Sequence, residues 1–333
     1  MIGSILKDSN LDPTIIVGGV VKSINTNSVL GSGDTFVVEA DEFNRTFLEL
    51  SPTIAVINNI DLEHIDCYDS LEDLKDAFTH FANSVPFYGM VSVCKDSQNA
   101  ASIIPLIDKP IVTYGIESDN VDFKAINIIH DNGTVAFDLI YENKSYAFSM
   151  IIPGSYNILN ALAAISVCKT MGLSIQRISE SLKSFSGVKR RFDIKVHSEK
   201  LTIIDDYAHH PVEVFSVIKA VKSNWSRRLV VIFQPHLYSR TKEFYKDFAE
   251  SLLGADVVFI TEIFASREKL DISITSRNIS NHLKKLEHKN VFDTTTDSVI
   301  EDIKNYYNEG DIIFSVGAGN IWRYADKLTE NIQ

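Results

Sequence analysis

The chain has 333 residues, of which 45% are hydrophobic and 23% are charged, and its formal net charge is −12; this allows two ordinary globular domains with full cores. The acidic balance excludes a general nucleic-acid surface, because neutralising phosphates requires clustered Lys and Arg. No apolar stretch reaches the ~18 residues that cross a bilayer, no secretory signal is visible, and the three cysteines lack metal-ligand spacing, so we expect a cytoplasmic protein without nucleic-acid or membrane partners.

The first eight residues have the spacing of a helix, with Ile2, Ile5 and Leu6 on one face. This helix has no N-cap residue, and no strand comes before it. It ends at Ser9 and Asn10, and an apolar run follows. The sequence therefore begins as if partway through an α/β unit.

The first half of the chain alternates short β-branched runs with helical patterns. Apolar runs at 34–40, 53–59 and 90–94 are typical of parallel strands, which are buried on both faces. Residues 70–84, between the second and third runs, predict an amphipathic helix whose Ser70 and Asp73 resemble a capping box.

Residues 123–154 have a different, alternating pattern. It predicts antiparallel hairpins around the Asp-Asn-Gly turn at 131–133. A helix follows over 157–171, and Gly172 is its predicted stop. The hairpins are expected to extend the parallel sheet of the first domain.

The polar and basic stretch SGVKRRF, residues 186–192, is interpreted as the hinge between two domains, 1–188 and 189–333. The second half restarts the alternation of apolar runs and helical patterns. This predicts a second doubly wound, Rossmann-like α/β domain, with ligands beyond the carboxyl ends of its strands. The predicted strands lie at 201–208, 229–235, 256–262, 290–296 and 311–319.

Acidic residues and a histidine follow two predicted strands of the first domain. Glu39 and Asp41 follow one strand, and His64 and Asp66 lie just beyond the next. In a parallel sheet both groups would reach the same rim. Glu39 and His64 could then share Mg²⁺, which needs few protein ligands, although imidazole is a less usual ligand for it. The pattern also fits solvated loop carboxylates and a surface histidine.

The stretch IIDDYAHHP, residues 203–211, places five polar or titratable groups directly after a buried strand. Structural needs alone seldom produce such a cluster, so ligand binding is indicated. Metal ligation by His209 and His210 is conceivable, but adjacent side chains point different ways and no cysteine assists. The neighbouring strand ends in FQPHLYSRT, which contains His236 and Arg240. Arg240 either binds a carboxylate in bidentate fashion or is an exposed helix-start residue.

Gly317 and Gly319 follow the last predicted strand, in the order of a dinucleotide-binding motif. The third glycine of that fingerprint is absent, because position 322 is Trp, and no βαβ unit follows. A dehydrogenase is therefore disfavoured. The glycines are interpreted as letting a tight loop approach a ligand or a helix.

Seven motifs together resemble the Mur ligases, over a span from Met1 to about Arg323. They are EADE, NNIDLEHID, PGSYNILNALAA, GVKRRFD, DDYAHHP, FQPHLYSRT and GAGNI. Members of this family have a UDP-binding domain, a central ATPase domain and a C-terminal Rossmann-like domain. The pattern resembles most the members that use ATP and Mg²⁺ to join L-alanine to UDP-N-acetylmuramate, through an acyl phosphate, in peptidoglycan precursor synthesis.

The resemblance implies roles for individual residues. Glu39 and His64 would hold Mg²⁺, and Asn157 and Asn160, on the first turn of a helix, would contact adenosine. Arg191, at the hinge, would reach the γ-phosphate of ATP when the domains close, and it would act in catalysis. The surface for ATP and L-alanine would comprise Asp206, Tyr207, His209, His236 and Arg240, of which Asp206 is assigned to ATP and His209, His236 and Arg240 also to catalysis. Tyr156 and Leu237 depart from the residues of many relatives.

The family's phosphate loop, of the form G-T-H-G-K-T-T-T, should directly precede the first helix, but no G-x-x-G-K-T run occurs in the chain. The UDP-binding domain is not recognised either, so we expect a truncated ligase without appreciable activity alone. Without the strand that feeds this loop, two strands of the central sheet should lack a neighbour. Two alternatives stay open. One is a related ligase that recycles a tripeptide onto the same sugar nucleotide, and the other is a non-catalytic fragment that associates with a separately encoded N-terminal part.

Overall fold

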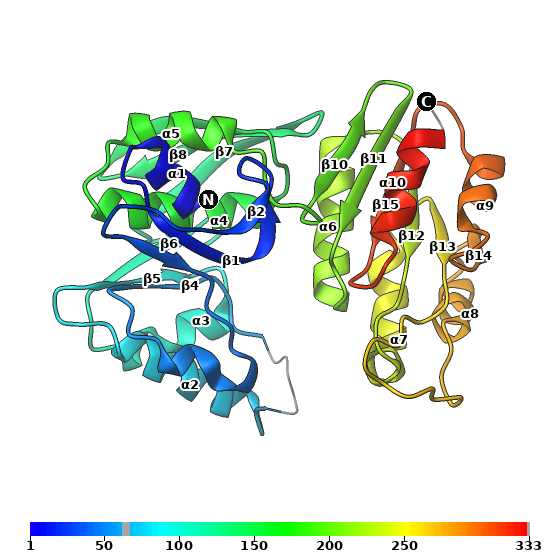
Figure 1. Cartoon of the computed structure of the whole chain (residues 1–333), viewed down its shortest axis with the longest axis horizontal. Coiled ribbons are helices and arrows are strands. Elements are labelled where there is room, and N and C mark those ends of the chain that lie inside the picture. Colours follow the sequence, from blue (N-terminus) through cyan, green and yellow to red (C-terminus); the bar gives the residue numbers. More distant parts are fainter. Residues whose placement is uncertain (62–66, 332–333) are drawn as a thin grey trace. The chain divides into compact units, whose positions relative to one another are not determined.

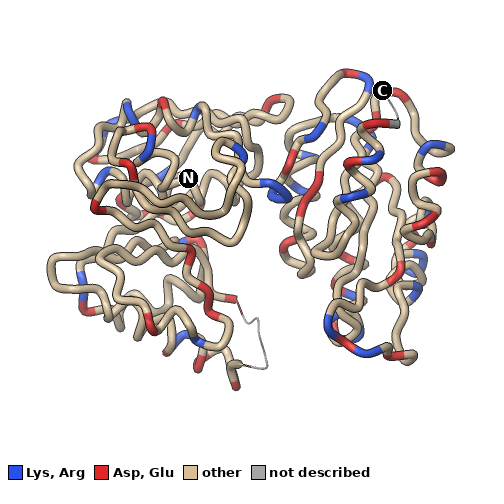
Figure 2. The backbone as a smooth tube through the Cα atoms, in the orientation of Figure 1, with Lys and Arg blue, Asp and Glu red and all other residues tan. Residues whose placement is uncertain are grey.

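The computed structural model describes residues 1–61 and 67–331. The chain divides into two compact units, which we call unit 1 (residues 1–130 and 134–186) and unit 2 (residues 131–133 and 187–333). Each unit is built of α-helices and β-sheet (Figure 1), and acidic and basic residues are interspersed along both (Figure 2). Among the described residues, no helix has the length and apolarity that crossing a bilayer requires.

Unit 1 begins with a short helix and a small sheet. A three-stranded sheet has the order β2-β1-β3, in which β1 is antiparallel to β2 and parallel to β3. The 3₁₀ segment η1 follows. The elements are α1 (Ile2–Asp8), β1 (Thr14–Val21), β2 (Thr26–Val29), β3 (Phe36–Val38) and η1 (Phe43–Glu49).

A six-stranded sheet forms the centre of unit 1, and its strands lie in the order of the chain. The pairs from β4 to β7 are parallel, and β8 and β9 are antiparallel. The predicted parallel sheet with a hairpin extension is therefore confirmed. The strands are β4 (Ile54–Ile57), β5 (Met90–Cys94), β6 (Ile111–Gly115), β7 (Phe123–Asp131), β8 (Thr134–Tyr141) and β9 (Lys144–Met150).

The strands β3 and β4 belong to different sheets, which differs from the single parallel sheet expected from the sequence. β3 pairs with β1 through Thr14 opposite Phe36, whereas β4 pairs with β5. Each is the last strand of its own sheet. The two acidic strand ends are therefore not brought together by direct strand pairing.

Helices of unit 1 begin and end largely where capping residues predict. Ser70 Oγ accepts the amide of Asp73 at 3.2 Å, but the Asp73 carboxylate accepts the Asp69 amide and not that of Ser70, so only half of the predicted capping box forms. Gly172, at φ +90°, follows the last turn of α4 as predicted. The elements are α2 (Leu71–Asn83), α3 (Gln98–Ile103), η2 (Ile104–Leu106), α4 (Ser155–Thr170) and α5 (Ile175–Ser184).

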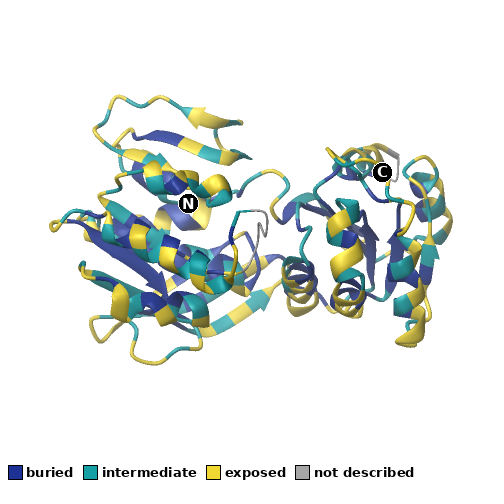
Figure 3. Cartoon of the chain, turned by 90° about the horizontal axis from the view of Figure 1, so that it is seen from below, coloured by how far each residue is buried: buried dark blue, intermediate teal, exposed yellow. Residues whose placement is uncertain are grey.

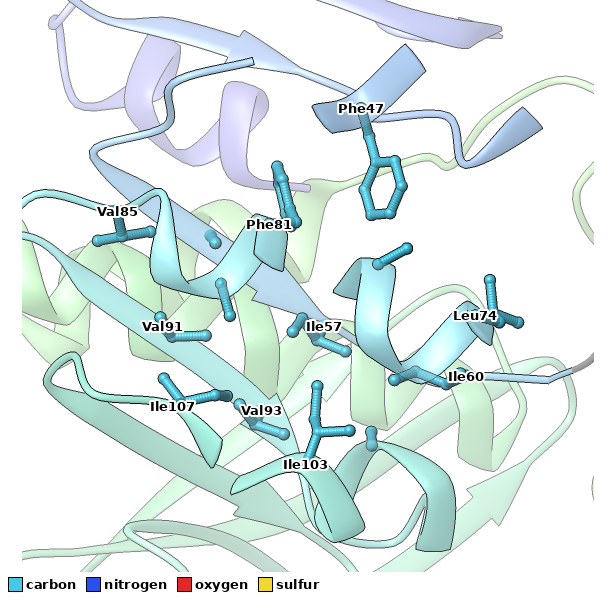
Figure 4. Close-up of a cluster of buried hydrophobic side chains, with 14 of the residues drawn as sticks. Phe47, Ile57, Ile60, Leu74, Phe81, Val85, Val91, Val93, Ile103 and Ile107 are labelled. Carbon is cyan, nitrogen blue, oxygen red and sulfur yellow. The ribbon is translucent and has the colours of Figure 1, made fainter. Parts of the chain in front are cut away.

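Helices cover both faces of the central sheet. On one face α2 and α3 pack on β4 and β5 around a cluster that includes Ile57, Val93 and Ile103 (Figure 4). Successive side chains of a strand point to opposite faces, and Ser92 bonds Ser166 of α4 at 2.6 Å. α4 therefore covers the other face.

Unit 2 has a six-stranded sheet in the order β10-β11-β15-β12-β13-β14, parallel except for β10. α6, α7 and α8 pack side by side, α9 and α10 pack together, and the central strands are buried between helices (Figure 3). This confirms the predicted doubly wound unit, although β10 was not predicted. The strands are β10 (Asp193–His197), β11 (Leu201–Asp206), β12 (Leu229–Phe233), β13 (Val257–Ile260), β14 (Val291–Asp293) and β15 (Asp311–Val316). The helices are α6 (Pro211–Asn224), α7 (Tyr238–Leu252), α8 (Arg277–Lys285), α9 (Val299–Tyr306) and α10 (Trp322–Asn331).

The strand order brings three carboxyl ends together. β15 lies between β11 and β12, and Val316 is paired with both Asp206 and Phe233. The chain passes from β11 through α6 to β12 and returns later to β15, so the strand order switches at this point. Such a switch point is where ligands bind in open α/β sheets.

Candidate functional site

Two carboxylates lie at the carboxyl end of β11, and both are buried. Asp205 accepts a hydrogen bond from Ser315 Oγ at 2.5 Å, and its Oδ2 lies 3.7 Å from Arg190 Nε. Asp206 accepts the amides of Phe192 at 2.6 Å and Ala208 at 2.7 Å. Burial raises the pKa of Asp205 to about 6 and that of Asp206 to about 7. Asp205 thus interacts with Ser315 and Arg190, and Asp206 with two backbone amides, so both carboxylates are engaged by the protein itself.

The segment before β10 is held in an unusual conformation. Arg190 and Phe192 have φ of +62° and +45°, a region that residues other than glycine rarely adopt. The bond from the Phe192 amide to Asp206 fixes this segment against β11. The guanidinium groups of Arg190 and Arg191 lie 4.7 Å and 5.3 Å from the ring centre of Tyr207. Strain of this kind is retained where surrounding structure enforces it, and here it orients the exposed Arg191.

The glycine loop after β15 packs tightly on the end of β12. A Cβ on Gly317 would lie 2.6 Å from the Gln234 carbonyl oxygen, and one on Gly319 would lie 2.2 Å from Gln234 Oε1. Arg190 Nη2 donates to the carbonyls of Gly317 at 2.6 Å and Gly319 at 3.2 Å. The glycines therefore serve a close approach within the protein, in line with the rejection of a dinucleotide fingerprint.

Two histidines that follow β11 and β12, the strands on either side of β15, face each other. The ring centres of His209 and His236 are 5.9 Å apart at 72°, and the His236 ring stacks on Phe264. Burial, with Arg240 nearby, lowers the pKa of His209, and burial together with His209 and Arg240 lowers that of His236 to about 4. Both imidazoles are therefore neutral near pH 7, where each offers one acceptor and one donor nitrogen.

Arg240 lies in the first turn of α7, next to these histidines. Its Nη1 atom is buried and has no hydrogen-bond partner among the described residues, and the same is true of His236 Nδ1. A buried donor without a partner costs about 1–3 kcal/mol. The Arg240 Nη1 donor thus marks a place where an acceptor oxygen of a ligand would be stabilised. His236 Nδ1 is a second unpartnered atom there, and its role as donor or acceptor depends on the tautomer.

Tyr207 completes the set of predicted residues that unit 2 brings together. Its carbonyl lies 3.0 Å from His209 Nδ1, and its ring contacts that of His209 at 5.1 Å between centres. The hydrogen bond fixes the orientation of the His209 ring. The predicted residues Arg191, Asp206, Tyr207, His209, His236 and Arg240 all lie at this edge of the sheet, with Asp206 turned inward.

In unit 1 the predicted metal ligand Glu39 follows β3 and is exposed. Its Oε2 accepts the amide of Gly18 at 2.6 Å. His64 lies outside the described residues, so its predicted partnership with Glu39 stays a prediction. The described part of the chain contains no group of three side chains that could hold a metal ion by themselves. One exposed carboxylate nevertheless fits Mg²⁺, which is commonly held by one or two carboxylates together with phosphates and waters.

The predicted adenosine contacts, Asn157 and Asn160, are both on α4. Asn157 is buried, and its Nδ2 donates to the Pro153 carbonyl at 2.7 Å, which fixes the amide and leaves Oδ1 as an acceptor. Asn160 is partly exposed. The sequence predicted that Asn160 lies in the first turn of the helix. Because α4 begins at Ser155, Asn160 instead lies in the second turn.

Three residues that support the site were not predicted. Arg190 bonds the glycine loop, as described above. Glu213 accepts the amides of His209 at 2.8 Å and His210 at 3.1 Å, a position that the spacing of a capping box could have indicated. Glu268 accepts amides at the start of α7, and it lies in an irregular loop that no local pattern connects with that helix.

A hollow of about 540 Å³ in unit 2 lies away from this site and is lined partly by basic residues. Lys222 pairs with Asp256 at 2.7 Å, and Arg228 lies 3.4 Å from Asp311. Arg227 donates to the Gly310 and Asp311 carbonyls. Lys222 and Arg227 are thus engaged within the protein, and the hollow lies at the amino ends of β12 and β13, opposite to the strand ends of the candidate site.

Comparison with known proteins gives consistent matches along the chain. Residues 1–168 match the Mur ligase middle domain, and residues 190–319 match the domain described as Mur ligase, glutamate ligase domain. A UDP-N-acetylmuramate–L-alanine ligase of Geotalea daltonii is 40% identical over 335 residues, covering 100% of this chain and 73% of that protein. The corresponding ligase of Geotalea uraniireducens is 41% identical over 337 residues, with the same coverage.

Solved structures agree with these matches. The UDP-N-acetylmuramate-alanine ligase of Thermotoga maritima has a TM-score of 0.84 and 27% identity, over 100% of this chain and 71% of that one. A murein peptide ligase of Psychrobacter arcticus has a TM-score of 0.67 and 21% identity, over 99% of this chain and 73% of that one, which shows a shared fold alone.

Proposed function

The chain belongs to the Mur ligase family, and from this premise we propose that it serves to join L-alanine to the carboxylate of UDP-N-acetylmuramate at the expense of ATP. The names of the relatives at 40% and 41% identity support this choice of substrates. The observation that carries it is the buried, unpartnered Arg240 Nη1 beside two neutral imidazoles. An amino acid offers a carboxylate for the arginine and an amine for the imidazoles.

Arg240 would bind the α-carboxylate of L-alanine. A guanidinium matches a carboxylate in charge and in bidentate geometry. His236 and His209, being neutral, can accept hydrogen bonds from the amine, and Tyr207 would lie beside them. Neither imidazole adds a positive charge that would oppose the binding of an ammonium group, and an imidazole acceptor orients the amine for attack.

The reaction would proceed in two steps. First, a carboxylate oxygen of the muramoyl group attacks the γ-phosphorus of ATP, the bond to ADP breaks, and an acyl phosphate forms. Second, the alanine nitrogen attacks the acyl carbon, the bond to phosphate breaks, and the amine loses a proton. The protein contributes mainly positioning and charge stabilisation. Arg191, which is exposed beside Tyr207, would face the transferred phosphoryl group.

Unit 1 would supply the nucleotide side of the reaction. Asn157 and Asn160 would contact adenosine, and Glu39 with His64 would hold Mg²⁺. The metal, when bound, offsets negative charge on the phosphates. Asp206 would act on the nucleotide side indirectly, by holding the segment of Arg191. We propose residues 1–188 and 189–333 as the ATP-binding and amino-acid-binding domains.

The test is alanine-dependent phosphate release with ATP, Mg²⁺ and UDP-N-acetylmuramate. It should be run on the chain alone and on the chain preceded by the N-terminal region of an intact family member, because these 333 residues contain no G-x-x-G-K-T run. Turnover with L-alanine in the second form is expected, and little in the first. Preference for a tripeptide over L-alanine would overturn the proposed substrate. The relatives match as single chains, so a separately encoded partner gains no support.

A further inference from the structure

The helix α7, which carries Arg240, begins without a cap of its own. Its N-cap residue is Leu237, whose side chain cannot accept a backbone amide. Leu237 also has φ +70° and ψ 137°, a conformation that a leucine rarely adopts. The first amides of a helix lack acceptors within the helix and need them from elsewhere. Something outside α7 must therefore hold its first turn.

Glu268 supplies the missing acceptor from a distant loop. One carboxylate oxygen accepts the Tyr238 amide at 2.5 Å and the Ser239 amide at 3.1 Å, and the other accepts the Ser239 hydroxyl. These are the first two residues of the helix, and a negative charge there also suits the helix dipole. Although burial opposes ionisation, these hydrogen bonds lower the pKa of Glu268, so it is charged near pH 7.

The loop that carries Glu268 is itself joined to the segment before α7. The Phe264 amide donates to the Pro235 carbonyl at 2.8 Å, and the Leu237 amide donates to the Phe264 carbonyl at 3.0 Å. Between these two bonds lies His236, whose ring stacks on that of Phe264. The same loop therefore fixes His236 from one side and the start of α7 from the other.

We propose that Glu268 is a positioning residue, which caps α7 in place of Leu237 and so orients Arg240 and His236 toward the amino-acid substrate. This inference rests on the proposed function, because it concerns the same site. Arg240 is the third residue of α7, directly after the two residues that Glu268 holds. If the carboxylate is removed, the strained Leu237 can relax, the first turn can fray, and Arg240 loses its fixed direction.

Glu262 offers a matched control in the same unit. Its carboxylate accepts bonds of the same two kinds, from the amide of Thr296 at 3.0 Å and from its hydroxyl at 2.5 Å. Glu262 lies in the same loop as Phe264 and Glu268, and it joins that loop to the one after β14. A Glu262→Ala variant loses bonds of the same kind without touching α7, so it separates a general loss of loop order from loss of this particular cap.

The first measurement follows amide hydrogen exchange in the 333-residue chain by NMR. In Glu268→Ala, exchange at the Tyr238 and Ser239 amides, which Glu268 accepts, should accelerate about tenfold or more, the size of effect that a lost helix cap produces. Glu268→Gln should give a smaller acceleration, because a carboxamide keeps one acceptor oxygen. Glu262→Ala should leave these amides unchanged. Unchanged exchange in Glu268→Ala would overturn the inference.

The second measurement is the KM for L-alanine and for ATP in the ligase-active form of the protein. Glu268→Ala should raise the alanine KM roughly tenfold, a loss comparable to one charge-assisted hydrogen bond, and should leave the ATP KM within about twofold. If Glu268 only stabilised the fold, its removal would change the KM for L-alanine and the KM for ATP together, or would change neither. If Arg240→Ala raises the alanine KM but Glu268→Ala does not, the inference fails and the proposed function stands. If neither variant changes it, or the wild type does not use L-alanine, the proposed function fails as well.

Discussion

Replacing Arg190 by methionine should destabilise unit 2 strongly, because this arginine is the counterion of a fully buried carboxylate. Asp205 has 0% side-chain exposure and lies 3.7 Å from Arg190 Nε. Arg190 also satisfies the Gly317 and Gly319 carbonyls. Removing one partner of a buried pair costs about 3–5 kcal/mol. Because Asp205 keeps its bond from Ser315, we expect a loss near 3 kcal/mol, the lower end of that range.

The loss should depend on pH in a defined direction. The pKa of Asp205 is already raised to about 6 by burial, and losing Arg190 should raise it further. Below that pKa the carboxyl group is neutral and needs no counterion. The destabilisation of Arg190→Met should therefore be largest at pH 8 and shrink toward pH 5, by at most ~1.4 kcal/mol per pH unit.

Denaturant unfolding followed by tryptophan fluorescence measures this directly. The chain has two tryptophans, and both, Trp225 and Trp322, lie in unit 2. The double variant Arg190→Met with Asp205→Asn should be more stable than Arg190→Met alone at pH 8. Lys222→Met breaks a half-exposed pair with Asp256 and should cost less than about 1 kcal/mol. A loss below about 1 kcal/mol in Arg190→Met, or one without pH dependence, would refute this reasoning.

Three further predictions concern the same edge of the sheet. The pKa of Asp206 is raised from 3.8 to about 7, so the folded state keeps the carboxyl proton to higher pH than the unfolded state does. Protonation of Asp206 therefore contributes its full stabilisation below pH 4, and this contribution is lost as the pH rises to 7. Relative to Asp206→Asn, the wild-type free energy of unfolding should thus fall over this range by up to roughly 4 kcal/mol, and a parallel pH profile in the two proteins would contradict this. Gly319→Ala places a Cβ 2.2 Å from Gln234 Oε1 and 2.7 Å from Phe264 Cγ; unfolding midpoints should show a loss of about 1–3 kcal/mol, and an unchanged midpoint would mean that the loop moves without cost. Arg240→Ala should raise the alanine KM about tenfold to a hundredfold with little change for ATP, and an unaltered value would place the carboxylate elsewhere.

Much of the sheet structure could be predicted because parallel strands are buried on both faces and so read as apolar runs. The runs that became β5 and β12 are fully buried in the structure. By contrast β2, with the sequence TNSV, and β10, with DIKVH, are edge strands with polar residues, and they were missed. The separation of β3 from β4 could not be predicted either, because strand pairing depends on partners distant in the sequence.

The candidate site was predictable as a location but not as a set of contacts. The strand ends at Asp206 and His236 could be identified because titratable residues directly after buried strands are unusual. Residue type does not show whether a carboxylate faces a ligand or its own backbone, and Asp206 faces the amides of Phe192 and Ala208. Glu268 could not be found from sequence, since it caps a helix that begins 30 residues earlier.

The buried carboxylates at the candidate site bear on how an acidic chain could bind an anionic ligand. A chain with a net charge of −12 repels an anionic ligand unless its own carboxylates are neutralised where that ligand binds. Asp205 is paired with Arg190, and Asp206 is engaged by backbone amides, so both point into the protein. Arg240 Nη1 is a buried donor that has no hydrogen-bond partner among the described residues. Asp205 and Asp206 thus hold Arg190 and the segment of Arg191 without presenting their own charge to a ligand. This is why we count these buried carboxylates with the candidate site although they need not touch a ligand.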